Sequence, residues 1–173
     1  MKVLLTGEPG SGKSTALART IEILKEKGIK IGGIVTPEVR SKGKRIGFVV
    51  KDVYSDTEGI LARVDQKVGP KLGKYTIDLE SFEKVALPAL DFAIKNCEII
   101  VIDEIGKMEF LSEKFKQKIL EIFNSDKKVI AVVHKNFVSR FKSFGKVIEV
   151  NPKNRDSLPQ ELAKYFLSGS AQN

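Results

Sequence analysis

The sequence predicts one α/β domain with three layers, in which helices cover both faces of a mostly parallel central sheet. Two observations support this prediction. Short apolar runs alternate with helical patterns along the whole chain, and the most apolar run, residues 98–102 (EIIVI), is typical of a central parallel strand that is covered on both faces. The chain has 173 residues, of which 42% are hydrophobic, and it is therefore long enough to bury a core within one domain.

The individual elements follow from local patterns of apolar and turn-forming residues. In the first helix, for example, Leu17, Ile21 and Leu24 recur at helical spacing, and Gly28 ends the helix. The expected strands are residues 2–6, 29–36, 98–102, 128–133 and 146–150. The expected helices are residues 14–27, 81–95, 112–124, 137–141 and 158–167.

Parts of the chain depart from this alternation. Residues 38–54 hold two β-rich runs around Lys42-Gly43, which predicts a β-hairpin inserted into the α/β core. Residues 55–76 are polar and glycine-rich, so we expect them to be irregular. Pro88 predicts a kink or a break inside its helix, and residues 168–173 (SGSAQN) are expected to be frayed.

Composition limits the class of protein. No apolar run approaches the ~18 residues that a membrane span needs, so we expect no membrane association. A single cysteine, Cys97, excludes an internal disulfide, and no signal sequence precedes the first strand, so a cytoplasmic location is expected. The net charge of +8 fits either a lysine-rich solvated surface or a polyanionic partner, a nucleotide or a nucleic acid. Abundant Lys and Glu beside few Met and Cys fit a heat-adapted source.

A phosphate-binding loop is predicted near the N-terminus, where VLLTGEPGSGKST (residues 3–15) matches the pattern G-x-x-x-x-G-K-[ST]. Its glycines let backbone N–H groups wrap around a phosphate, and the helix that follows adds its positive end. Lys13 is expected to contact the β- and γ-phosphates, and the Ser14 hydroxyl to ligate Mg²⁺. The predicted nucleotide-binding residues of this loop are Gly7, Glu8, Pro9, Gly10, Ser11, Gly12, Lys13, Ser14 and Thr15.

A second motif, CEIIVIDEIGKMEF (residues 97–110), places Asp103 and Glu104 at the end of the most apolar strand. Open α/β sheets bind ligands at the carboxyl ends of their strands. Asp103 is expected to hold the Mg²⁺ shell, usually through water. Glu104 is expected to activate a water molecule as general base, and the alternative is that it only caps the helix that follows.

At these two motifs the chain resembles the small nucleoside-triphosphatases of thermophilic archaea and bacteria, a family whose animal member is called cancer-related nucleoside-triphosphatase. The likeness includes GGIVTPEVRSKGKRIGFVV, VGPKLGKYTIDLESFEKVALPAL and NPKNRDSLP, and it extends over roughly residues 1–167. The resemblance implies Mg²⁺-dependent hydrolysis of nucleoside 5′-triphosphates to diphosphates with little selection among bases. It also implies a P-loop fold in which an extra strand separates the strand before the loop from the Asp103-Glu104 strand.

Basic residues of the hairpin are candidates for neutralising transition-state charge. Arg40 is the first choice and Arg45 the second, among a group that also holds Lys42 and Lys44. A solvated basic edge that discourages strand pairing is the equal alternative.

Four further residues each allow two interpretations. Lys107 either faces the active site or pairs on the surface with a neighbouring glutamate. His134, at the end of a strand, either senses the γ-phosphate or makes an ordinary hydrogen bond. Arg155 is expected to stack on the base, and Asp156 to cap the final helix, two roles that are compatible.

Together, the two motifs and the family resemblance imply slow hydrolysis of ATP, GTP, CTP and UTP, with Lys13, Glu104 and Arg40 as the expected catalytic residues. Ser14 and Asp103 are the predicted Mg²⁺ ligands. Without a partner that supplies further positive charge at the γ-phosphate, turnover is expected to be slow. Two alternatives remain open: a kinase of a nucleotide, a small molecule or a polynucleotide, and a switch that binds nucleic acid under the control of nucleoside triphosphate. Nucleic acid is not required by the sequence, and nothing in it demands more than a monomer.

Overall fold

A computed structural model describes residues 1–170 of the chain. The strands are β1 Lys2–Thr6, β2 Ile31–Val35, β3 Glu38–Ser41, β4 Lys44–Asp52, β5 Glu58–Arg63, β6 Lys71–Leu72, β7 Tyr75–Ile77, β8 Ile99–Ile105, β9 Lys128–Val133 and β10 Lys146–Glu149. The α-helices are α1 Lys13–Glu26, α2 Leu79–Asn96, α3 Glu113–Phe123, α4 Val138–Phe141 and α5 Leu158–Ser170. The short 3-10 helices are η1 Glu109–Leu111, η2 Lys135–Phe137 and η3 Lys142–Phe144.

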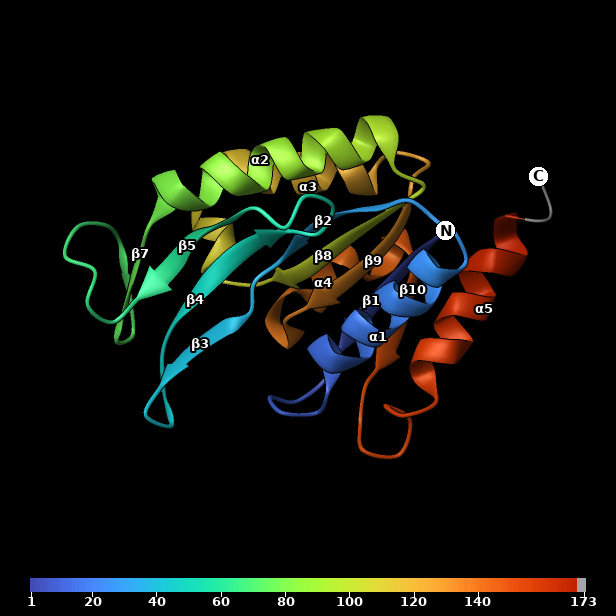
Figure 1. Cartoon of the computed structure of the whole chain (residues 1–173), viewed down its shortest axis with the longest axis horizontal. Helices are drawn as coiled ribbons and strands as arrows, with labels where there is room; N and C mark the ends of the chain where they lie inside the picture. Colours follow the sequence, from blue (N-terminus) through green and yellow to red (C-terminus); the bar gives the residue numbers. More distant parts are fainter. Residues whose placement is uncertain (171–173) are drawn as a thin grey trace.

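All of these strands belong to one sheet with the order β10-β1-β9-β8-β2-β4-β5-β7-β6, and β3 pairs with β4. The strands from β10 to β2 are parallel, and those from β4 onwards extend the sheet with antiparallel pairs. Helices lie on both sides of the sheet (Figure 1). The predicted three-layer α/β fold is therefore confirmed, and β3 and β4 form the predicted hairpin around Lys42-Gly43.

The parallel part of the sheet places the two sequence motifs side by side. β9 lies between β1 and β8 and pairs in parallel with both, so the extra strand that the family resemblance implied is present. Because β1, β9 and β8 run in the same direction, their carboxyl ends meet at one edge of the sheet, where α/β folds bind ligands. The phosphate loop, the Asp103-Glu104 pair and His134 are brought together at this edge.

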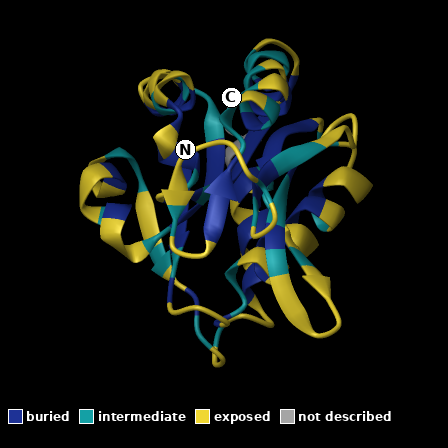
Figure 2. Ribbon diagram, turned by 90° about the vertical axis from the view of Figure 1, so that its left-hand side faces the viewer, coloured by how far each residue is buried: buried dark blue, intermediate teal, exposed yellow. Residues whose placement is uncertain are grey.

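Two clusters of buried side chains hold the helices against the two faces of the sheet. Along β8, Ile100 and Ile102 belong to the cluster with α2 and α3, whereas Ile99 and Val101 belong to the cluster with α1 and α5. This alternation follows from the two-residue repeat of a strand. Figure 2 shows the central strands as buried and the outer loops as exposed. The apolar run EIIVI is thus a strand covered on both faces, as predicted.

The helix α2 continues through a proline. Its buried residues, Phe82, Val85, Ala86, Ala89, Leu90 and Ala93, have the spacing of an amphipathic helix. Pro88 is exposed on the other face, and a proline inside a helix costs about 3 kcal/mol. Burial of large side chains such as Phe82 and Leu90 contributes about 1.5–3 kcal/mol each, which offsets that cost. The break expected at Pro88 is therefore wrong, because α2 runs unbroken from Leu79 to Asn96.

The expectation that residues 55–76 are irregular is wrong for residues 58–63, 71–72 and 75–76, which lie in strands. This segment contains β5, β6 and the start of β7. β5 pairs with β4 along its length, and α2 covers it, since the backbone N–H of Ile60 donates to the Ser81 hydroxyl at 2.8 Å. Leu61 and Tyr75 are buried in the core beneath α2. These contacts are long-range, so the local pattern of a polar segment does not indicate them.

The C-terminal helix is longer than expected. α5 extends to Ser170, so residues 168–170 are helical and the expectation of fraying is wrong for them. Residues 171–173, the rest of the segment expected to be frayed, lie outside the described residues. None of the helices within residues 1–170 combines the length and the apolar character that crossing a bilayer requires.

Candidate active site

The phosphate loop joins β1 to α1 through glycines in left-handed conformations. Gly7, Gly10 and Gly12 have φ angles of 148°, 78° and 102°. No side chain fits at Gly7, because a Cβ there would lie 2.6 Å from the carbonyl oxygen of Val150. The helix α1 begins at Lys13 without a side-chain cap. The N–H groups of its first turn are therefore available to an anion.

The Lys13 side chain folds back over the loop. Its ammonium donates a hydrogen bond to the carbonyl oxygen of Gly7 at 2.7 Å. Its positive charge lowers the pKa values of Asp103, Glu104 and His134, although burial is the largest influence on each of them. Lys13 is thus surrounded by the groups that lie at the carboxyl ends of β8 and β9.

The two residues predicted to bind Mg²⁺ are in contact. Asp103 is only 8% exposed, and the Ser14 hydroxyl hydrogen-bonds to its carboxylate. The pKa of Asp103 is raised to about 7, and burial is the main cause. The negative charge of Glu104 also raises this pKa, whereas the hydrogen bond from Ser14 and the positive charge of Lys13 lower it. The Thr36 hydroxyl holds the strand end by donating to the carbonyl oxygen of Asp103 at 2.8 Å. A hydroxyl beside a carboxylate supplies the oxygen ligands that Mg²⁺ prefers.

Glu104 lies within a bulge of β8. The pairing with β9 shifts between Asp103 and Ile105, so Glu104 has no partner on that strand, and the Asp103–Glu104 peptide bond is cis. A bulge redirects the side chains of its strand, and here Glu104 lines the same cleft as Lys13. Burial raises the pKa of Glu104, and the charge of Lys13 opposes this rise.

The alternative role of Glu104 as a helix cap does not fit the structure. The next helical segment, η1, begins at Glu109 and is preceded by Met108. α3 is capped by Ser112, whose hydroxyl accepts a hydrogen bond from the N–H of Phe115 at 3.1 Å. Glu104 is therefore free of any capping role.

Glu109 is a buried carboxylate that the sequence analysis did not propose as a site residue. It is 3% exposed, and its Oε2 atom has no hydrogen-bond partner among the described residues. It lines the cleft, and burial, reinforced by the charge of Glu104, raises its pKa well above the ordinary value of 4.5. In the sequence, Glu109 stands between the apolar residues Met108 and Phe110 (GKMEF), and this position could have indicated a buried carboxylate.

His134 presents one ring nitrogen to the cleft. Its Nδ1 accepts a hydrogen bond from the backbone N–H of Asn136 at 3.2 Å, which places the ring proton on Nε2. Burial lowers the pKa of His134, and the charges of Lys13, Lys107 and Lys135 lower it further. The neutral imidazole can therefore donate one hydrogen bond from Nε2 into the cleft.

These groups share one cleft with a volume of about 820 Å³. The phosphate loop, Asp103, Glu104 and His134 form one end of it. From there the cleft continues past Thr36 and Pro37 after β2 to side chains of β4, β5 and β6, among them Arg45, Phe48, Leu61 and Leu72. A second hollow of about 420 Å³ lies between α1 and α5 and contains no residue of the phosphate loop.

A sequence model of a family described as NTPase matches residues 2–163, a range that contains the phosphate loop, Asp103 and Glu104. The chain belongs to this NTPase family. Two similar relatives are called nucleoside-triphosphatase THEP1. The protein of Methanocaldococcus jannaschii is 41% identical over 170 residues, which are 98% of this chain and 99% of the relative. The protein of Methanosarcina acetivorans is 42% identical over 172 residues, which cover 96% of this chain and 97% of the relative.

Two solved structures extend this similarity to the fold of the NTPase family. The crystal structure of THEP1 from the hyperthermophile Aquifex aeolicus superposes with a TM-score of 0.83 and 29% identity, over 96% of this chain and 99% of that chain. The solution structure of a human cancer-related nucleoside triphosphatase gives a TM-score of 0.79 and 33% identity, over 96% and 97% of the two chains. The family predicted from the two motifs is thereby confirmed.

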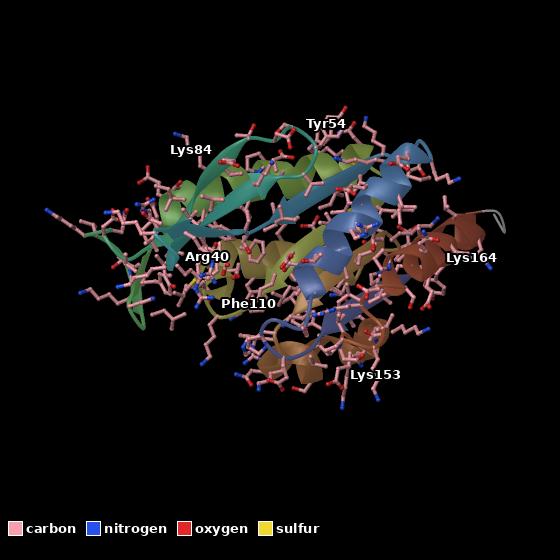
Figure 3. All side chains as sticks on the ribbon, turned by 60° about the horizontal axis from the view of Figure 1, so that its bottom comes forward. Arg40, Tyr54, Lys84, Phe110, Lys153 and Lys164 are labelled. Atoms are coloured by element: carbon pink, nitrogen blue, oxygen red, sulfur yellow. The ribbon has the colours of Figure 1, made fainter. Side chains whose placement is uncertain are left out.

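The structure does not bring Arg40 into the cleft of this NTPase. Arg40 lies on β3 (Figure 3), and its guanidinium binds Glu38 Oε1 at 2.7 Å and the carbonyl oxygen of Gly43 at 3.2 Å. Arg45, the second choice, does line the cleft. Lys107 lines it too, is exposed, and forms no ion pair with Glu104 or Glu109.

The remaining predicted residues lie around the loop. Pro9, Gly10, Gly12 and Thr15 line the cleft with Lys13 and Ser14. Ser11 is buried, and Glu8 reaches outward to form an ion pair with Lys135 at 3.4 Å. Arg155 packs over the loop, because a Cβ on Gly12 would lie 3.0 Å from its Cδ. α5 begins at Leu158, so Ser157 rather than Asp156 precedes the first helical residue.

Proposed function

We propose that this protein hydrolyses nucleoside 5′-triphosphates to diphosphates and phosphate, with Mg²⁺ as cofactor, slow turnover and broad base specificity that includes ATP, GTP, CTP and UTP. The observation that carries the proposal is the convergence of the phosphate loop, the Ser14–Asp103 pair and the partly buried Glu104 carboxylate on one cleft. The names of the relatives as nucleoside-triphosphatases support the same reaction.

The loop would bind the triphosphate through backbone N–H groups and the Lys13 ammonium. In the structure this ammonium is already held at the loop by the carbonyl oxygen of Gly7. A small movement would transfer it to oxygens of the β- and γ-phosphates. Arg155, which packs on Gly12, would support the base by stacking, which requires no particular pattern of donors and acceptors.

Ser14 and Asp103 are the residues that would hold Mg²⁺. When bound, the ion neutralises charge on the β- and γ-phosphate oxygens. Among the described residues, no group of three or more His, Cys, Asp and Glu side chains is arranged as a metal site. This agrees with Mg²⁺, which commonly uses one or two carboxylates and completes its shell with water and substrate phosphates.

Glu104 would take the proton from the attacking water. A partly buried carboxylate with a raised pKa holds a proton better than an exposed one, which suits a general base. His134, which lines the cleft and accepts a hydrogen bond at Nδ1, would donate from Nε2 to the γ-phosphate. Lys13 and Lys107, which both line the cleft, would offset the developing charge. Without a partner that supplies a further cation, turnover would be slow.

The test is phosphate release from each of the four nucleoside triphosphates, with and without Mg²⁺. We expect Glu104→Gln to lower kcat by about 10²–10⁴, the usual contribution of a general base, while nucleotide binding is kept. Lys13→Ala should lose binding. Glu113→Gln, a change at an exposed glutamate of α3, is the matched control. If wild type binds nucleotide without releasing phosphate, or if Glu104→Gln keeps full activity, the proposal fails. A monomeric state and a cytoplasmic location stay predictions.

A further inference from the structure

We propose that the end of the cleft formed by β4, β5 and β6 is a binding site for a nucleoside monophosphate, which accepts the γ-phosphoryl group in place of water. The proposal rests on the nucleotide site described above as the donor site. It goes beyond hydrolysis because it assigns a second substrate to Glu38, Arg45 and Phe48, which the proposed hydrolysis does not use.

The direction of the cleft across the sheet is the first argument. The strands lie in the order β1-β9-β8-β2-β4-β5, and the phosphate loop with Lys13 follows β1. The cleft residues Asp103 on β8, Thr36 after β2, Phe48 on β4 and Leu61 on β5 therefore lie at increasing distance from the loop. Arg155 and the rest of the β10 side do not line this cleft. A triphosphate whose base lies toward Arg155 would therefore leave the β4–β6 end empty.

The geometry of phosphoryl transfer makes this end an acceptor position. The attacking oxygen must approach the γ-phosphorus roughly opposite to the bond that breaks. The leaving β-phosphate is held by the loop, so the attack comes from the side of Glu104 and β8. The β4–β6 end of the cleft continues outward from that side, beyond Thr36 and Pro37.

The chemistry of the walls indicates a ligand with a planar apolar part. Phe48, Leu61 and Leu72 line this end, and Phe48 is kept in place by an edge contact with Tyr75 at a centroid distance of 5.5 Å. Ligand sites that hold nucleotide-sized compounds combine such apolar walls with a few polar groups. A nucleobase has a flat face that fits this description.

Two cations indicate that the ligand is also an anion. The Arg45 guanidinium lies 5.2 Å from the centroid of the Phe48 ring, donates from Nε to the Tyr75 hydroxyl at 2.8 Å, and has Nη1 3.6 Å from Glu38 Oε2. It is therefore positioned before any ligand binds. Lys107 lines the same cleft. An arginine and a lysine that face one cavity are suited to a phosphate group, which Arg can bind through two hydrogen bonds.

Glu38 completes the set of polar groups at this end. Its carboxylate lines the cleft and is held between Arg40 and Arg45, and the hydrogen bond from Arg40 is the main cause of its lowered pKa. A carboxylate accepts hydrogen bonds from ring or exocyclic N–H groups, which nucleobases carry. A planar ring with N–H donors and a phosphate is the description of a nucleoside monophosphate.

The transfer step is balanced without a further reactant. A phosphate oxygen of the monophosphate forms a bond to the γ-phosphorus, and the bond from the γ-phosphorus to the oxygen that bridges it to the β-phosphate breaks. The electron pair of that bond stays on the departing diphosphate. One triphosphate and one monophosphate become two diphosphates, and no proton needs to be removed from an ionised phosphate acceptor.

The experiment follows label from the γ-phosphate of ATP in the presence of Mg²⁺ and, in separate reactions, AMP, GMP, CMP or UMP. Nucleotides and phosphate are separated, and the ratio of labelled diphosphate to labelled phosphate is measured. We expect labelled diphosphate with at least one monophosphate. Arg45→Gln and Phe48→Leu should lower the ratio by about tenfold or more, the effect of one lost specificity contact.

Matched controls lie on β5 and in the turn after β4, and neither residue lines the cleft. Arg63→Gln removes an arginine of β5 that pairs on the surface with Asp65, and Tyr54→Leu removes an aromatic ring that stacks on Phe92. Both should leave the ratio within about twofold of wild type, because surface changes of this kind have small effects. A dinucleoside pentaphosphate spans both nucleotide positions, so it should bind the wild-type protein more tightly than ATP does. In Phe48→Leu this difference in affinity between the pentaphosphate and ATP should be smaller.

The outcomes separate this proposal from the hydrolase proposal. Labelled phosphate without any labelled diphosphate overturns the acceptor site and leaves hydrolysis intact. A monophosphate that only competes with ATP overturns it as well, because the cleft then holds one nucleotide. Label in neither product refutes both proposals. Labelled diphosphate whose yield is the same in Arg45→Gln and Phe48→Leu overturns the location of the site.

Discussion

The Glu104 carboxylate lies directly against Gly106. A Cβ built on Gly106 would lie 3.1 Å from Oε1 of Glu104 and 3.4 Å from its Cδ and Cγ. The backbone of Gly106 is not in the left-handed region, so alanine can adopt its conformation. The absence of a side chain at position 106 thus decides where the proposed general base rests.

Gly106→Ala should lower kcat for phosphate release by roughly tenfold with little change in KM. The added methyl group would displace the carboxylate by a few tenths of an ångström, and a misplacement of about 1 Å can cost roughly 10²-fold. The measurement is steady-state kinetics of the single variant and of the pair with Glu104→Gln. In the Glu104→Gln background the alanine should have almost no further effect, since it acts through residue 104. Equal losses in both backgrounds would show that Gly106 acts in another way.

Glu109→Gln should make the free energy of unfolding less dependent on pH. The folded protein holds the Glu109 proton more tightly than the unfolded chain does, because burial and Glu104 raise its pKa. Stability from this group is complete below the ordinary pKa of 4.5 and is lost as pH rises toward the folded pKa. Glutamine cannot ionise, so the free energy of unfolding of the variant should rise relative to that of wild type between about pH 5 and pH 8. Urea unfolding at about 25 °C measures this difference.

The control for this prediction is Glu113→Gln, because Glu113 is exposed on α3 and forms only a surface ion pair. Its unfolding free energy should follow that of wild type across the same pH range. If the free energy of unfolding of Glu109→Gln and of wild type depends on pH in the same way, Glu109 does not have the raised pKa of a buried carboxyl group.

His134→Asn and His134→Gln should differ in activity. Asparagine can replace Nδ1 as the acceptor for the N–H of Asn136, but it is too short to place a donor at Nε2. The longer glutamine amide can reach that position. We expect kcat to fall by about 10–10²-fold in the asparagine variant, the range for one lost donor to transferred charge, and by less in the glutamine variant. Equal activities, with equal melting temperatures, would leave His134 as a turn residue only.

Gly33→Ala should destabilise the fold strongly. Gly33 has a φ of 124°, and a Cβ there would overlap the carbonyl oxygen of Val101 on β8. Overpacking of this kind costs about 1–3 kcal/mol and a left-handed alanine about 1–2 kcal/mol, so a loss of about 2–5 kcal/mol is expected by urea unfolding. Gly43→Ala, at the hairpin turn with open space around it, should lose only about 1–2 kcal/mol. Similar losses at both sites would contradict the close approach of β2 and β8.

The local sequence was sufficient for the parallel half of the fold. The alternation of apolar runs and helical patterns predicted β1, α1, β2, β8, α3, β9 and α5, because each buries apolar residues at its own period. The phosphate loop was equally predictable, since its glycines, Lys13 and Ser14 are adjacent in sequence. The family followed from the same two motifs, and its sequence model matches residues 2–163.

The antiparallel half was not predictable in the same way. β5 and β7 are short and lie in a polar segment, and they are strands because β4 and α2 lie beside them. The choice between Arg40 and Arg45 also depended on this half. Both belong to the hairpin, but only Arg45 lies on the cleft, where Tyr75 from β7 holds it.

The sequence by itself determined the elements of the parallel half, the phosphate loop and the acidic pair, because these depend on residues within one turn or one strand of each other. The tertiary structure alone decided which groups meet. It placed Ser14 on Asp103, buried Glu109 beside Glu104, and extended the cleft to Phe48 and Leu61. Such contacts join residues that are far apart in the chain, and their geometry depends on the order of strands in the sheet, which no local pattern specifies.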